Sequence, residues 1–181
     1  MNPVASPRRP SVAGFSRSVG LAALIAVSVC SVSQDKQKAA NTNAGSVEEE
    51  IKQIVSMYAK AADEADPTAA SHVWCDSSED SLINPVGRWH GVEQIMGFYL
   101  HDMGEMYSLR DLEISDVSVQ VYSDAAWAEF NWDFAAKLRK DGSSVSFHGM
   151  ETQIYRKTHS GWCLVHVHYS TLPAEKKAAT E

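Results

Sequence analysis

The sequence predicts an α+β fold, in which a curved antiparallel sheet forms a cone around three N-terminal helices. In three segments between residues 47 and 106, apolar residues recur every three to four positions, which is typical of amphipathic helices. From residue 109 onward they recur at every second position, which is typical of strands that bury one face. Tight turns join the later strands, so neighbouring strands are expected to pair antiparallel.

Three helices are expected in the first half of the chain. Ser46 is the N-cap of a capping box, which predicts a helix over 47–64 with one apolar stripe. Asp66, followed by a proline in the first turn, predicts a second helix over about 67–75. A third helix is expected over about 92–106. These helices provide the apolar surface that the sheet covers.

The strands are expected around the third helix and after it. A short strand precedes that helix and ends at Pro85. Asp141-Gly142 and the stretch 159–161 are turn sequences that join the last strands into hairpins. The expected strands are 81–84, 117–122, 126–134, 144–157 and 162–171.

The 181 residues leave room for one ordinary domain. Residues 1–33 resemble an export signal, because three arginines precede a short uncharged apolar run. The alternative is a membrane anchor, but about fifteen apolar residues are fewer than the ~20 that a membrane span needs. Residues 34–45 are expected to be a polar linker, 46–173 the cone domain, and 174–181 a flexible tail. The domain is therefore expected to be periplasmic or secreted.

The three cysteines leave two questions open. The stretch 27–30 resembles a bacterial lipobox in which Cys30 is lipidated, although Val29 occupies a position that usually holds a small residue. The alternative is cleavage after Ser33. Cys75 and Cys163 either form a disulfide in an oxidising compartment or stay as two buried thiols.

The charge balance limits the classes of partner. The net charge is −7, and loss of residues 1–33, which hold three arginines and no acidic residue, would make it −10. An acidic domain has no electrostatic attraction for nucleic acid. Contact with a membrane is expected only through a lipid on Cys30.

The last predicted strand carries an unusual row of polar side chains. Strict alternation puts successive residues on opposite faces of the sheet. One face then holds Leu164, His166, His168 and Ser170, and the other holds Val165, Val167 and Tyr169. We expect the histidine face to point into the cone, where an imidazole can act as acid or base near neutral pH.

The order of elements and three stretches resemble the nuclear transport factor 2-like superfamily, in particular its SnoaL-like and calcium/calmodulin-dependent kinase II association-domain-like branch. The stretches are 89–95, 124–127 and 149–170, and the resemblance covers about 46–173. It implies the cone fold, a small-molecule ligand and association into a homodimer or higher homo-oligomer. It does not fix the reaction, because this fold hosts isomerases, dehydratases, hydrolases and assembly modules.

The last strand is also similar to that of the iota-class carbonic anhydrases, which carry three histidines and two serines before a Met-Pro pair. Val167 and Tyr169 depart from that signature, since the family has histidine and serine there. The resemblance implies hydration of carbon dioxide without a metal or other cofactor. The residues that it would make catalytic are His168, Ser170, Tyr99 and Ser81.

Other side chains are candidates for the pocket wall or for different chemistry. The predicted lining residues are His166, Glu151, Leu164 and Trp162. The pair His166 and His168 could also start a zinc site, with Glu151, His148 or Glu129 as a third ligand, but no second close pair of ligands is present. Glu129 and Asp133 are expected to face solvent, because the apolar residues between them have the better claim on the core.

Two function classes follow. The first is an exported lyase or hydratase that acts on a small molecule, with carbon dioxide hydration as its best-defined form. The second is a non-catalytic homo-oligomeric module, whose subunits would pair through the face formed by Val165, Val167 and Tyr169.

Overall fold

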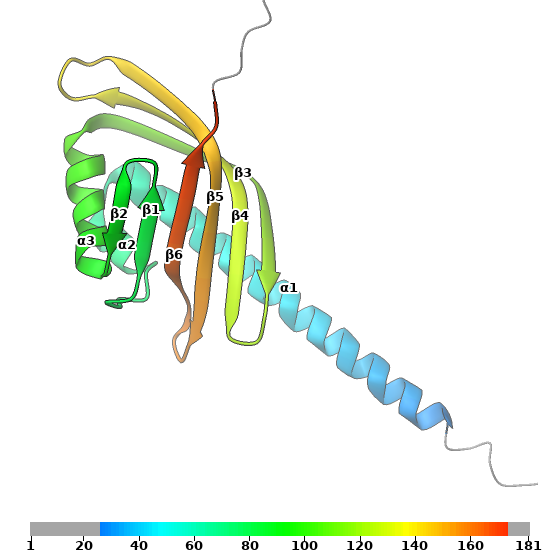
Figure 1. Ribbon diagram of the computed structural model, residues 1–181. Helices are drawn as coiled ribbons and strands as arrows, with labels where there is room; N and C mark the ends of the chain where they lie inside the picture. The colour runs from blue at the N-terminus through cyan, green and yellow to red at the C-terminus, as the bar shows by residue number, and fades with distance from the viewer. Residues whose placement is uncertain (1–25, 174–181) are drawn as a thin grey trace, which may run out of the picture. The chain divides into compact units, whose positions relative to one another are not determined.

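The computed structural model describes the backbone of residues 26–173 and the side chains of residues 45–173. The chain divides into two units, Met1–Ala40 and Asn41–Glu181. The described part of the first unit is helical, and the second unit carries the fold (Figure 1). The elements are α1 Ala26–Glu64, α2 Pro67–Ser71, β1 Ser81–Asn84, β2 Gly87–His90, α3 Val92–Gly97, the π-helix η1 Phe98–Glu105, β3 Tyr107–Val121, β4 Ala125–Leu138, β5 Ser144–Thr158 and β6 Gly161–Thr171.

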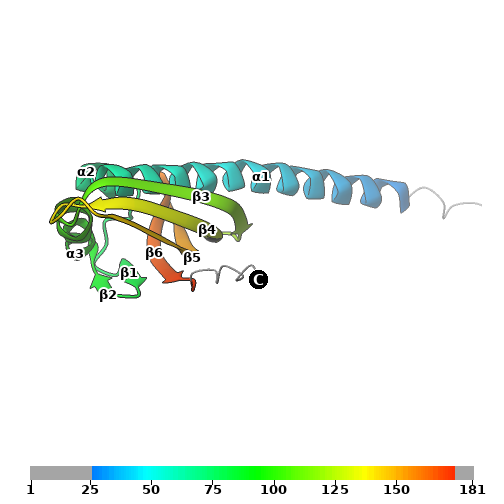
Figure 2. The same ribbon diagram turned by 90° about the horizontal axis from the view of Figure 1, so that it is seen from above.

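One curved six-stranded sheet has the order β2-β1-β6-β5-β4-β3. The helices of the second unit lie on one side of this sheet, as Figure 2 shows from above. This arrangement confirms the α+β class and the cone. The sheet is mixed rather than purely antiparallel, because β1 runs parallel to β6. Strand β2, which pairs with β1 across a tight turn, was not predicted.

Helix α1 is longer than the predicted helix. It begins at Ala26, so residues 34–45 are helical where a polar linker was expected. Residues 26–45 contain no proline that would break the helix. A capping sequence starts a helix only where the preceding chain leaves the helical conformation. Residues 1–25 of the predicted signal and the tail 174–181 lie outside the described residues. In the part of the chain that the structure describes, no helix has the length and apolar character to cross a membrane.

The apolar stripe of α1 packs against the concave face of the sheet. Strand β4 supplies the opposing surface, with its even-numbered residues from Ala126 to Ala136 all buried. The stripe and the first half of this row, from Ala126 to Phe130, belong to the main core, as predicted from the two periodicities, and the second half, from Trp132 to Ala136, forms a separate smaller cluster. The buried stripe residues of α1 are Val47, Ile51, Ile54, Val55, Tyr58, Ala61 and Ala62.

The side chain of Arg110 on β3 links three elements by hydrogen bonds. Its guanidinium donates to the backbone oxygens of Asp63, Met103 and Tyr107, at 2.8, 3.2 and 2.7 Å. The Asp63 carboxylate in turn accepts the backbone N–H of Leu112 at 2.7 Å. These bonds join the end of α1, η1 and the start of β3.

A β-bulge in β6 reverses which face its side chains occupy. Leu164 lies opposite Tyr155 and His166 lies opposite Ile154, so Val165 is an extra residue in β6. An extra residue shifts the alternation by one position and moves every later side chain to the other face. The prediction of one face from Leu164 to Ser170 is therefore wrong.

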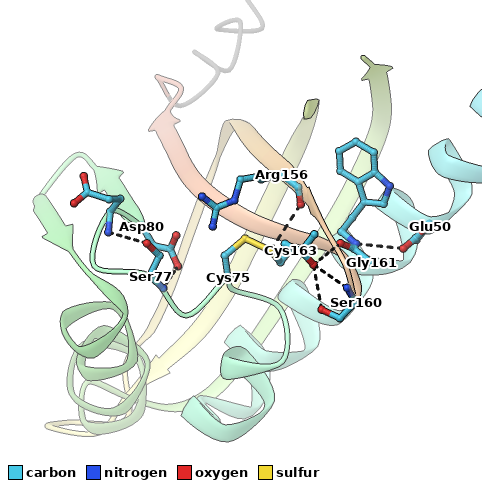
Figure 3. Close-up of a disulfide and its surroundings, with 11 residues drawn as sticks. Glu50, Cys75, Ser77, Asp80, Arg156, Ser160, Gly161 and Cys163 are labelled. Carbon is cyan, nitrogen blue, oxygen red and sulfur yellow. Dashed lines mark hydrogen bonds between the residues drawn. A yellow bond between two sulfur atoms is a disulfide. The ribbon is translucent and has the colours of Figure 1, made fainter. Parts of the chain in front are cut away.

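A disulfide fixes the start of β6. Cys75, in the segment after α2, is bonded to Cys163 with a Cα–Cα distance of 5.0 Å (Figure 3). Next to it, Trp74 forms an isolated parallel bridge with Leu164, and the N–H of Cys75 donates to the carbonyl of Leu164 at 2.9 Å. Of the two alternatives for these cysteines, the structure shows the disulfide.

Candidate functional site

The concave side of the sheet contains a cavity of about 210 Å³. A dry cavity of about 150 Å³ in another protein holds a benzene molecule, so this one has room for a ring-sized ligand. Its walls come from α1, the β1–β2 turn, η1 and strands β3 to β6. Half of its lining residues are aromatic. The lining residues are Tyr58, Ala62, Asn84, Pro85, Val86, Phe98, Tyr99, Met103, Tyr107, Leu112, Trp132, Phe134, Phe147, Glu151, Tyr169 and Thr171.

Glu151 is the one acidic residue among the described residues that line this cavity. It lies on the inner face of β5 and is 4% exposed. Burial raises the pKa of its carboxyl to about 7, against the hydrogen bonds from Gln153 and Tyr58 that lower it. A carboxyl with a pKa near neutrality can both accept and donate a proton under physiological conditions.

A chain of buried side chains orients this carboxyl. The Tyr155 hydroxyl donates to Gln153 Oε1, which fixes the direction of the Gln153 amide. Gln153 Nε2 then donates to Glu151 Oε1 at 2.7 Å. Tyr58 of α1 also donates to the Glu151 carboxylate. The Glu151 carboxyl is therefore held by residues of both the sheet and the long helix.

Two tyrosine hydroxyls in the same cavity each accept a hydrogen bond from the protein. Trp74 Nε1 donates to the Tyr99 oxygen at 3.5 Å, and Asn84 Nδ2 donates to the Tyr169 oxygen at 2.8 Å. Because Trp74 and Asn84 are the donors in these bonds, the bonds do not use the hydroxyl protons of the two tyrosines. Each hydroxyl can therefore donate its proton to a ligand. Burial raises the pKa of both tyrosines, so both stay protonated at neutral pH.

The charge of the cavity favours uncharged ligands. Its lining, as far as the structure describes it, contains no lysine, arginine or histidine. An anion would enter an apolar space next to a buried carboxyl group with no cation to compensate its charge, which costs several kcal/mol.

Two of the eight predicted site residues, Tyr99 and Glu151, line this cavity. Leu164 and Trp162 point to the same side of the sheet but are buried in the core beside the cavity. Their prediction as pocket lining is wrong, because Trp74 and the helices fill the space above this end of β6.

The other four predicted residues lie on the opposite, outer face of the sheet. Ser81 Oγ and His166 Nδ1 are hydrogen bonded at 2.8 Å, and His168 and Ser170 are exposed. The bulge at Val165 is the physical reason why the three β6 residues point outward. Their predicted orientation into the cone is wrong, and the pKa of His166 is lowered by burial and by the neighbouring His168.

The sequence reasoning missed three polar residues of the site. Tyr58 belonged to the predicted stripe of α1 and was assigned to the core. Tyr169 was assigned to the outer face, because the bulge was not anticipated. Asn84 precedes Pro85 in a turn, and its side-chain oxygen accepts the backbone N–H groups of Val86 and Gly87 at 2.9 and 3.0 Å.

Two other predictions concern the strand carboxylates of β4 and a zinc site. Glu129 and Asp133 are exposed on the outer face of β4, as predicted. Among the described residues no group of three or more His, Cys, Asp or Glu side chains is arranged to hold a metal ion. The zinc alternative therefore has no ligand set in the described part of the chain.

The fold and its aromatic cavity define a cone domain with a cavity of ligand size. The chain belongs to the SnoaL-like domain family, whose model matches residues 51–175, and to the nuclear transport factor 2-like superfamily. That family includes dehydratases and ligand-binding proteins. No functionally curated protein matches the chain.

Several solved structures are similar. A nuclear transport factor 2-like superfamily protein from Salmonella enterica serovar Typhimurium is 35% identical, with a TM-score of 0.70 over 76% of this chain and 99% of that one. A type 2 hexachlorocyclohexane dehydrochlorinase is 15% identical, with a TM-score of 0.60 over 80% and 97%. A calcium/calmodulin-dependent protein kinase II association-type domain from Xanthomonas campestris is 16% identical, with a TM-score of 0.59 over 70% and 88%. The last two share the fold.

Proposed function

We propose that this domain binds a small uncharged organic molecule in the cone cavity and catalyses proton transfer on it, as a lyase or hydratase does. One observation carries the proposal: Glu151, with a pKa of about 7, shares a cavity lined largely by aromatic residues with two tyrosine O–H donors. The dehydrochlorinase of similar fold is a precedent for elimination in this family of folds.

The proposed chemistry follows from the directions of the hydrogen bonds. Glu151 removes a proton from a carbon atom next to a carbonyl group, and the electron pair of the broken C–H bond moves toward the carbonyl oxygen. Tyr99 and Tyr169 donate to that oxygen as its negative charge develops. In an elimination, the electrons then return to expel a leaving group from the adjacent carbon, and a carbon–carbon double bond forms.

Proton abstraction can be tested without the natural substrate. We expect the full chain to accelerate exchange of the α-protons of cyclohexanone for deuterium in D2O at pD 8, followed by proton NMR. Glu151→Gln should lower this exchange by at least about a hundredfold, because an amide cannot act as the base. The matched control is Asp133→Asn, which alters an exposed carboxylate on the outer face and should leave the rate unchanged. Equal rates for wild type and Glu151→Gln would refute the proposal.

Hydration of carbon dioxide is less well supported by the geometry than chemistry at Glu151. The resemblance requires His168, Ser170 and Ser81 to act together with Tyr99. Tyr99 lines the cavity, whereas the other three lie on the outer face of the sheet. The water-activating group would then be separated from Tyr99 by the thickness of the sheet.

We further propose that the domain is exported. The support is the charged and apolar pattern of residues 1–33 together with the Cys75–Cys163 disulfide, since stable disulfides are typical of oxidising compartments. Mass spectrometry of the protein from a bacterial periplasmic fraction should find an N-terminus after Ser33, or a lipid on Cys30. An intact N-terminus in the cytosolic fraction alone would contradict export.

We also propose that the domain associates with itself, as the association-type domain of similar fold suggests. The face predicted for this contact needs correction, because Val167 is fully buried and Tyr169 lines the cavity. The outer face instead presents Met150 and Ile154 of β5, which are 49% and 40% exposed.

A further inference from the structure

The cavity opens to solvent near the start of β5. Along the inner face of this strand, Gly149, Glu151, Gln153 and Tyr155 are all buried. Phe147 is the next inner-facing residue toward the start of the strand, and it is 43% exposed although it lines the cavity. No element that the structure describes therefore covers the concave face at Phe147, and this ring lies at the opening.

The β1–β2 turn and the end of β6 complete the opening. Pro85 and Val86 of the turn line the cavity, and Val86 is 87% exposed. Thr171, at the end of β6, also lines the cavity and is exposed. Figure 1 shows the turn at the same end of the sheet as the last residues of β6. We call these three residues and Phe147 the mouth of the cavity.

The mouth is apolar where a charged surface would be expected. Single exposed apolar side chains are common on proteins, but here Pro85, Val86 and Phe147 line one opening together. Contact with water is unfavourable for such surface, so a ligand that covers it with apolar atoms gains free energy. The four mouth residues carry no charge, and they offer no cation to a charged ligand group.

The size of the cavity indicates that a ligand can extend beyond it. If a cavity of about 150 Å³ holds benzene, one of about 210 Å³ holds only a few more atoms, and cyclohexanone nearly fills it. Phe147 and Glu151 lie on the same strand face, about 13 Å apart along β5 at about 3.3 Å per residue. A single ring at Glu151 does not span that distance, so the mouth contacts a second part of the ligand.

We propose that the substrate is an uncharged carbonyl compound with an apolar chain that leaves the cavity through the mouth. Its carbonyl end lies at Glu151, and its chain lies between Val86 and Phe147. The inference rests on the proton transfer proposed above and specifies the substrate class of the same site. A chain that ends in a carboxylate would place a charge against apolar side chains, which weakens binding.

A series of ketones that differ only in the chain tests this assignment. In cyclohexanone, 4-propylcyclohexanone and 4-pentylcyclohexanone, the chain is opposite the carbonyl group and leaves the α-protons unchanged. In the deuterium-exchange assay on the full chain, kcat/KM should rise with chain length, by up to about fourfold for each methylene group. The matched ligand is 3-(4-oxocyclohexyl)propanoate, whose chain has the length of propyl and a charged end. It should exchange at least about tenfold more slowly than 4-propylcyclohexanone.

Variants of the mouth test the position of the chain. The quantity compared is the ratio of kcat/KM for 4-pentylcyclohexanone to that for cyclohexanone, so that each variant is its own reference. Val86→Asp and Phe147→Asp should each lower this ratio at least about fivefold, because a carboxylate replaces the apolar contact. The matched control is Tyr122→Asp, which changes an aromatic side chain that is 61% exposed beyond the far end of β3 and should leave the ratio unchanged. Circular dichroism of each variant checks that the fold is intact.

Binding of the same ketones, measured by isothermal titration calorimetry, separates this inference from the proton transfer. If no ketone exchanges but Kd falls with chain length and rises in both mouth variants, the proton transfer is refuted and the apolar chain is supported. If cyclohexanone exchanges but neither kcat/KM nor Kd improves with the chain, the apolar chain is refuted and the proton transfer stands. A ratio that falls equally in Tyr122→Asp also overturns the assignment to the mouth, and absence of binding by every ketone overturns both proposals.

Discussion

Glu151 carries a carboxyl group that is almost fully removed from water. Its carboxyl lies among aromatic rings, and its hydrogen-bond partners come from the same strand and from α1. Burial favours the neutral form, and the partners only partly offset that effect. The group is thus kept near its titration point, which is the condition for efficient proton transfer at neutral pH.

This raised pKa also makes stability depend on pH. Between the ordinary value of 4.5 and about 7, the folded state binds the proton more tightly than the unfolded state. The contribution of this group to the free energy of unfolding should therefore be highest below pH 4.5. It should fall by up to about 3 kcal/mol as the pH rises to 7 and then level off.

The measurement is a pH series of urea unfolding curves for wild type and Glu151→Gln. The glutamine variant lacks the ionisation, so its stability relative to wild type should increase between pH 4.5 and 7. A constant difference between the two proteins over this range would contradict the raised pKa.

Two single residues of the site were anticipated from the sequence. Glu151 was expected in the pocket as a strand carboxylate, and Tyr99 was expected there because of the family resemblance; both line the cavity. The prediction placed Tyr169 on the outer face and His168 on the inner face, and the structure has them the other way round. Their identities carried no signal about the bulge, which depends on how β5 and β6 fit together.

At the level of elements, periodicity identified most helices and strands but not their irregularities. The alternation that defined β6 is interrupted by one residue, and that interruption decides which side chains meet the ligand cavity. The helix after β2 was predicted as one unit, whereas its second half is the π-helix η1. Wider helical turns of this kind often occur at functional sites, and η1 carries Tyr99 and Met103 into the cavity.

The start of α1 shows a different limit of local signals. A serine followed by a glutamate three residues later satisfies the capping-box rule, yet the helix continues through it from Ala26. The rule describes what stabilises a helix start, and it does not show that the preceding residues leave the helix. Chain context decides that, and here the preceding residues include good helix formers such as alanine, lysine and glutamine.

For the whole molecule, the class of fold followed from two hydrophobic periods, whereas the closure of the cone did not. The sheet is completed when β1, only four residues long, pairs parallel with β6, about 85 positions later in the chain. Short strands have little periodicity to read, and a pairing over that separation has no local signature. The Cys75–Cys163 disulfide lies at the same junction and fixes it covalently.

This position gives the disulfide two expected effects. It closes a loop with a sequence separation of 88, which in the chain-entropy account stabilises the fold by about 4–5 kcal/mol. That is a large part of the total stability of an ordinary domain, about 5–15 kcal/mol. It also holds Trp74 against β6, and Trp74 donates to the Tyr99 hydroxyl in the cavity.

We therefore expect reduction to lower both the melting temperature and the function of the cavity. In thermal unfolding by circular dichroism, a phosphine reductant should lower the Tm of wild type by about 10–20 °C. Cys75→Ala/Cys163→Ala should melt near the reduced wild type and not respond to the reductant, whereas Cys30→Ser should respond like wild type. Deuterium exchange of cyclohexanone should slow in the reduced protein below its Tm, because Tyr99 loses a fixed donor. If exchange is unchanged while the Tm falls, the disulfide stabilises the fold without positioning Tyr99.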